Sequence, residues 1–120
     1  MRKLILLVCL FLHLGLAAAG LDKAATAYKK GDYKSAAKEY KRLAYIGDAK
    51  AQFCIGWMYY TGKGVTQNLV QAYKWASLSA NYGEKESVEF LELLAKKMTA
   101  SQVKLAERLA REWPTKYKKP

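Results

Sequence analysis

Histidine and cysteine are scarce in this 120-residue chain, which has one histidine, His13, and two cysteines, Cys9 and Cys54. His13 and Cys9 lie inside an apolar segment at the amino terminus. If that segment is removed as a signal peptide, neither a Ser-His-Asp nor a Cys-His arrangement can be built. A zinc site that needs histidine or several cysteines is excluded in the same way. We therefore expect that the protein is not an enzyme and that it has no catalytic residue, no metal site and no cofactor.

A phosphate-binding loop is also missing. The pair Gly62 and Gly64 lacks the third glycine and the preceding strand of a dinucleotide-binding turn. The single remaining cysteine, Cys54, cannot form an internal disulfide in an exported chain. It lies in an apolar stretch, so we interpret it as a buried, inert residue, with a mixed disulfide to a partner as the alternative.

The first 19 residues have the order of a secretory signal peptide. Arg2 and Lys3 precede a continuous apolar run, and residues 17–19 supply the small residues of an A-x-A cleavage site. We expect cleavage after Ala19, with Gly20 as the other option, and export to the periplasm or beyond the cell. The alternative is an uncleaved anchor, although the apolar stretch is shorter than the ~20 residues that span a membrane.

The residues that begin and end helices predict an all-α domain over residues 22–113, followed by a basic tail over 114–120. Three glycines stop helices, at positions 31, 47 and 83, and four residues with capping side chains start them: Asp32, Asp48, Asn68 and Thr99. Gln71 and Gln102 stand where a capping box needs them. The expected helices cover residues 22–30, 32–46, 48–61, 68–83, 84–97 and 99–113. They form a short α-solenoid of about three antiparallel hairpins.

A spacing of 36 residues relates the first half of this domain to the second. It separates Ala36 from Ala72, Ala44 from Ala80, and Gly47 from Gly83. Such a period is the signature of stacked repeats, which usually bind other proteins.

The stretch A-x-F-x-I-G-x-x-Y-x-x-G-x-G-V over residues 51–65, followed by Ala72, Trp75, Ala80 and Gly83, resembles a Sel-one-like repeat. That family is related to the tetratricopeptide repeat. Residues 24–45 resemble the degenerate opening hairpin of small secreted bacterial members, and residues 96–113 resemble their closing helices. Two positions depart from the pattern: Asn68 replaces the usual Asp, and Ser79 replaces a frequent Ala.

The resemblance implies that the first helix of each hairpin lines a concave face. On the helix over 48–61 that face would carry Lys50, Phe53, Trp57 and Tyr60. We predict protein binding by Lys50, Trp57 and Tyr60, and we expect Lys50 and Tyr60 to be exposed. The alternative for Trp57 and Phe53 is burial in the core, because this helix is apolar nearly all round. Trp75 is implied to pack inside the fold.

The net charge is +11, and it falls to +9 without Arg2 and Lys3. Four cations form a stripe on the helix over 32–46: Lys34, Lys38, Lys41 and Arg42. This stripe is either a solvated face or a surface that attracts an acidic partner or an anionic membrane. Nucleic acid is not expected as the partner of an exported protein.

Three functions remain open. The first is a monomeric, non-catalytic adaptor or scaffold that binds another protein. That partner would be acidic where it contacts the basic stripe. The second is a peripheral protein held at a membrane surface by its basic face. The third is a hydrolase of cell-wall or β-lactam substrates, an activity given to some secreted relatives. Those relatives carry paired cysteines in every repeat, and this chain does not.

Overall fold

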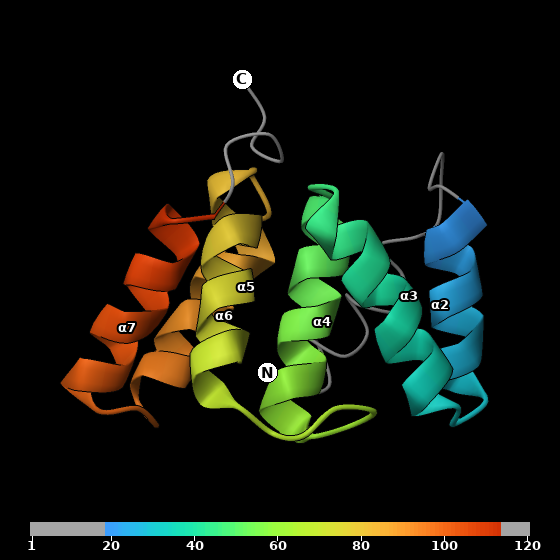
Figure 1. Ribbon diagram of the computed structural model, residues 1–120, viewed down its shortest axis with the longest axis horizontal. Helices are drawn as coiled ribbons and strands as arrows, with labels where there is room; N and C mark the ends of the chain where they lie inside the picture. Colours follow the sequence, from blue (N-terminus) through green and yellow to red (C-terminus); the bar gives the residue numbers. More distant parts are fainter. Residues whose placement is uncertain (1–18, 114–120) are drawn as a thin grey trace.

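The structure is a computed structural model that describes residues 19–113. These residues form six helices and no strand: α2 (Ala19–Lys29), α3 (Tyr33–Tyr45), α4 (Ala49–Thr61), α5 (Leu69–Asn81), α6 (Lys85–Ala95) and α7 (Ala100–Arg111). The helices stand side by side, with α2 at one end of the molecule and α7 at the other (Figure 1). The expectation of an all-α stack of helix hairpins is confirmed. The signal peptide and the basic tail lie outside the described residues, except that α2 begins at Ala19.

The helix ends repeat with the predicted spacing of 36 residues. Gly47 and Gly83 adopt almost the same left-handed φ, 97° and 98°. The next residue after each glycine donates its backbone N–H to a carbonyl five residues back, Asp48 to Leu43 and Glu84 to Ser79. Glycine adopts this φ without the steric cost of a Cβ, and the chain therefore makes the same kind of turn from α3 into α4 as from α5 into α6.

Four of the helix starts carry the predicted caps. The side chains of Asp32, Asp48, Asn68 and Thr99 accept the backbone N–H three residues further on. Thr99 and Gln102 complete a capping box. The predicted box at Asn68 is wrong, because the Asn68 N–H donates to the Tyr59 carbonyl and is not available to Gln71.

Helix α4 lies at the centre of the core, as its all-round apolar sequence predicts. Phe53 and Ile55 are fully buried, and Cys54 is buried between them as expected. Gly56 brings α4 close to α5, because a Cβ at this position would lie 3.2 Å from the Ala72 carbonyl oxygen. Trp75 packs inside, as the resemblance implied.

Ser79, one of the two departures from the repeat pattern, links three helices. Its hydroxyl donates to the Ala49 carbonyl at 2.7 Å and accepts from the Ser87 hydroxyl at 2.8 Å. Both serines are fully buried, and each satisfies the other. A polar residue therefore fits here because α6 supplies a second hydroxyl.

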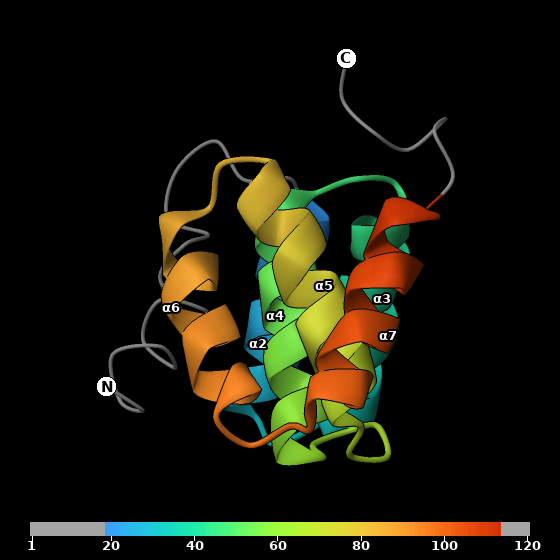
Figure 2. The ribbon, with the colours of Figure 1, turned by 90° about the vertical axis from the view of Figure 1, so that its left-hand side faces the viewer.

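The last two helices do not form a tight hairpin with each other. Both α6 and α7 pack mainly against α5, and they lie on opposite sides of it (Figure 2). Helix α7 therefore continues the layer of α3 and α5, and its end brings Trp113 against Trp75, with ring centroids 4.9 Å apart.

Candidate functional site

The predicted binding stripe on α4 is mostly buried. Trp57 is 5% exposed and Tyr60 is 8% exposed, while Lys50 is half-buried. Phe90 of α6 covers both aromatic rings, with centroids 5.6 Å from Trp57 and 5.9 Å from Tyr60. The expectation that Tyr60 is an exposed side chain is wrong for that reason, and the core alternative holds for Trp57 and Phe53. Contact of Lys50, Trp57 or Tyr60 with a partner remains a prediction.

A second surface lies on α3 and is more open. We call it the α3 groove. Its volume is about 650 Å³, and its lining combines basic and apolar side chains with a glycine: Lys34, Ala37, Lys38, Lys41, Arg42, Tyr45, Ile46, Gly64 and Val65. Tyr45 is 45% exposed and Ile46 is 63% exposed, which makes them two of the few large apolar side chains at the described surface. The groove thus contains the basic stripe predicted from sequence.

One wall of the α3 groove is the loop between α4 and α5. Gly64 has a φ of 75°, and a Cβ there would collide with the Tyr33 carbonyl oxygen at the start of α3. This close approach seats Val65 beside α3, where it packs on the core as expected. Gln67 holds the loop by donating its amide to the Tyr60 carbonyl at 2.9 Å.

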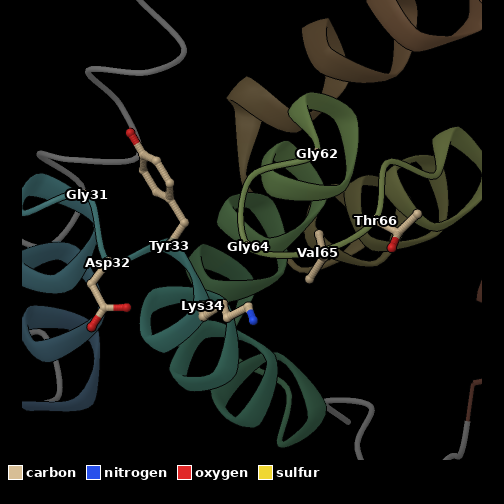
Figure 3. Close-up of a pocket in the computed structure, with 8 residues that line it drawn as sticks. All are labelled: Gly31, Asp32, Tyr33, Lys34, Gly62, Gly64, Val65 and Thr66. Atoms are coloured by element: carbon tan, nitrogen blue, oxygen red, sulfur yellow. The ribbon is translucent and has the colours of Figure 1, made fainter.

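A neighbouring pocket of about 610 Å³ shares Lys34, Gly64 and Val65 with the α3 groove. Figure 3 shows the loop residues Gly62, Gly64 and Val65 facing the first turn of α3. At this end Lys63 lies over two aromatic rings, with its Nζ 5.1 Å from the Tyr33 centroid. The basic surface therefore extends beyond the groove itself.

At the Tyr45 end the α3 groove meets a cluster of aromatic rings that surrounds a buried lysine. Tyr45 packs against Trp75 and Trp113, with centroids 5.5 and 5.3 Å away. The Lys74 ammonium lies over the same two indole rings, 4.3 and 5.2 Å from their centroids. Such cation–π contacts favour the charged form of the lysine.

Burial, in contrast, disfavours the charged form of Lys74. Desolvation, followed by the nearby charge of Lys41, lowers the pKa of Lys74 from 10.5 to about 8. No carboxylate of the described residues forms a salt bridge with it. Lys74 is therefore a nearly buried cation whose neighbouring charge is also positive.

The described residues contain no group of three or more His, Cys, Asp or Glu side chains that could hold a metal ion. Within residues 19–113 no helix has the length and hydropathy needed to cross a membrane.

Sequence reasoning found the four cations of the α3 groove but missed its apolar part and the lysine beside it. Tyr45 and Ile46 directly precede the Gly47 turn, and the local sequence does not distinguish an exposed pair there from one that packs in the core. Lys74 gives no local signal either, because its burial depends on Trp113, which is 39 positions away in the chain.

No family model and no curated protein sequence matches the chain. Among solved structures it is similar to the crystal structure of c5321, a protective antigen present in uropathogenic Escherichia coli strains that displays an SLR fold. The TM-score is 0.67 and the sequence identity is 22%. The similarity covers 97% of this chain and 30% of that protein.

The architecture is therefore that of a short α-solenoid of helix hairpins. More specifically, the chain has the Sel-one-like repeat (SLR) fold, as the motif over residues 51–83 implied.

Proposed function

We propose that this protein is an exported, non-catalytic protein-interaction module, an adaptor or scaffold of the SLR type. The observation that carries the proposal is the α3 groove, where exposed Tyr45 and Ile46 lie among cations on a rigid helical support. An exposed apolar patch rimmed by charge is typical of a surface that meets a partner. Stacked helix hairpins commonly present such surfaces to other proteins.

The groove replaces the α4 stripe as the favoured contact surface. Aromatic side chains contribute most to binding when they reach the partner, and Trp57 and Tyr60 are covered by Phe90. Lys50 remains accessible at the edge of that face.

A hydrolase finds less support. A serine nucleophile needs a base within hydrogen-bonding reach and access to substrate. Ser79 and Ser87 are bonded to each other in the core. Ser35 is exposed, and none of the hydrogen bonds recorded for the described residues joins its hydroxyl to a base.

Site-specific photocrosslinking tests the proposal. A photoreactive amino acid replaces Ile46 in the groove. In the matched control the same amino acid replaces Val88, another exposed aliphatic residue, which is 52% exposed on α6. The proposal expects a discrete protein adduct from position 46 in the native cell envelope and none from position 88. Adducts from 88 alone would move the interaction to the other face, and the absence of any adduct would contradict the adaptor function.

A further inference from the structure

The lysines of the α3 groove lack acidic partners. Among the described residues the salt bridges are Arg42 with Glu39 and Arg111 with Glu107. Lys34, Lys38 and Lys41 take part in neither. None of the three forms a salt bridge among the described residues, although the Glu39 carboxylate is close enough for the charge of Lys38 to act on it, and Lys41 lies over the Tyr59 ring.

Arg42 differs from the three lysines. Its Nε donates to Glu39 at 3.0 Å, and the pair lies against Gly20 at the start of α2. The hydrogen bond from Arg42 also lowers the pKa of the Glu39 carboxyl, which keeps the pair ionised. Glu39 thus pairs with Arg42 and also interacts with the charge of Lys38, and the excess positive charge of the groove comes from its lysines.

Lys74 adds a further positive charge beside the groove, although it is not among the residues that line it. Its side chain is nine-tenths buried, and its ammonium is held against Trp75 and Trp113 beside Tyr45. Beside desolvation, the charge of Lys41 lowers the pKa of Lys74, and that charge has the same sign. Lys41 lines the groove and its charge repels that of Lys74, so a carboxylate bound at Lys41 would offset this repulsion.

The dimensions of the groove suit a short peptide. Lys34 to Tyr45 covers about 16 Å of helix axis, the length of about five residues of extended chain. The exposed apolar side chains Tyr45 and Ile46 line the same groove as the lysines and are not gathered on a separate apolar face. A membrane-binding face would instead present its apolar side chains as the outermost surface.

We infer that the α3 groove binds an acidic, aromatic-containing segment of the partner protein. Its carboxylates pair with Lys34, Lys38 and Lys41, and an aromatic ring packs on Tyr45, Ile46 and Val65. This inference rests on the proposed function and names the chemistry of the partner.

A defined peptide tests the inference directly. The probe is a fluorescent peptide with two phenylalanines flanked on either side by glutamates, and binding to the protein is followed by fluorescence anisotropy. Raising the salt from about 0.1 to 1 M shortens the Debye length from about 10 to 3 Å, and we expect affinity to fall about tenfold or more. A peptide with alanine in place of phenylalanine should bind at least about fivefold more weakly. Equal binding of the two peptides would overturn the inference.

Matched variants locate the binding site. Lys34→Glu combined with Lys38→Glu changes two exposed residues of the groove and should weaken peptide binding about tenfold or more. The control combines Lys85→Glu with Lys104→Glu, which are exposed elsewhere, and should leave binding within about twofold because its net charge is the same. Ile46→Ser should weaken binding, whereas Val88→Ser should not. Equal effects of both charge variants would show non-specific attraction and overturn the inference.

Two further outcomes separate this inference from its alternatives. Sedimentation with phosphatidylglycerol vesicles that depends on Lys34 and Lys38, together with no peptide binding, would overturn it in favour of a membrane surface. A protein crosslinked from position 46 that binds the Lys34→Glu, Lys38→Glu variant at wild-type strength would overturn it and leave the adaptor function intact. If no protein is crosslinked, the adaptor function itself fails, whatever the peptide does.

Discussion

Lys74 keeps a positive charge in a place where burial and Lys41 oppose it and two indole rings support it. The folded pKa of about 8 lies below the unfolded value of 10.5, so burial of the charged lysine destabilises the fold at pH 7. Between those two values the unfolded state binds more protons, and stability therefore rises with pH.

We predict that Lys74→Met stabilises the protein at pH 7 by about 1–2 kcal/mol, a value reduced from the full pKa shift for the indole contacts and residual solvation. The advantage of the variant should shrink as pH rises from 8 toward 10, because wild-type Lys74 then becomes neutral in the folded state. Urea unfolding of both proteins at several pH values measures the difference.

The pH range must stop short of the titration of Tyr73. Burial, followed by the charge of Glu107, raises the pKa of Tyr73 above its usual 10. Above that pH Tyr73 ionises and its contribution to stability is lost, so the comparison is made at pH 10 and below. A stability difference that is constant from pH 7 to 10 would mean that Lys74 titrates alike in the folded and unfolded states.

Gly56 gives a second prediction at the scale of one residue. Gly56→Leu should lower stability by about 1–3 kcal/mol, because the new side chain meets the Ala72 carbonyl, Phe90 and Trp75. For a domain of this size each kcal/mol corresponds to about 4–8 °C in the melting temperature. The control Ala95→Leu adds the same side chain at an exposed position of α6 and should change stability by less than about 0.5 kcal/mol. Equal melting of the two variants would contradict the close packing of α4 on α5.

At the scale of elements, the loop over residues 62–67 determines how the second hairpin meets the first. Gly64 and Gly31 both have a left-handed φ, but only Gly64 lies against another backbone. We predict that Gly31→Ala costs about 1 kcal/mol, from backbone strain alone, whereas Gly64→Ala costs more because its methyl group must displace Tyr33. Urea unfolding of both variants measures this, and equal losses would show that the loop moves away from α3 freely.

The elements that sequence predicted well are those determined by neighbouring residues. Asp32, Asp48 and Thr99 cap helices through residues three positions away, and Gly47 ends a helix through its own φ. The box at Asn68 failed because a carbonyl nine residues earlier, in Tyr59, engages its N–H. Local rules cannot anticipate such a competitor.

The candidate site shows the same limit more strongly. The four cations of the α3 groove were visible as a helical stripe, because their spacing lies within one helix. Burial of Tyr60 depends on Phe90, and burial of Lys74 depends on Trp113. Both depend on how α6 and α7 pack around α5, which no single-helix pattern encodes.

At the scale of the whole molecule, the first described helix carries a core residue close to the predicted cleavage site. Helix α2 starts at Ala19, and Leu21, in its first turn, is buried in the core at 2% exposure. Cleavage after Ala19 would therefore leave this core residue in place, and cleavage two residues later would remove it. We predict that the protein recovered from the cell envelope has the intact mass of residues 20–120. A mass that includes Met1–Leu16 would favour a retained anchor.

Two truncated proteins test the physical basis of that boundary. We predict that a chain starting at Asp22 is less stable than one starting at Gly20 by about 1.5–3 kcal/mol, because it loses the burial of Leu21. A third protein starts at Gly20 and carries Leu21→Ala, so it keeps the first helical turn but lacks the Leu21 side chain. We expect it to be nearly as unstable as the chain that starts at Asp22. Thermal unfolding of all three measures the differences. If the chains that start at Asp22 and at Gly20 have the same melting temperature, Leu21 contributes nothing to the stability of the core. Cleavage after Ala19 would then suit the fold no better than cleavage further along the chain.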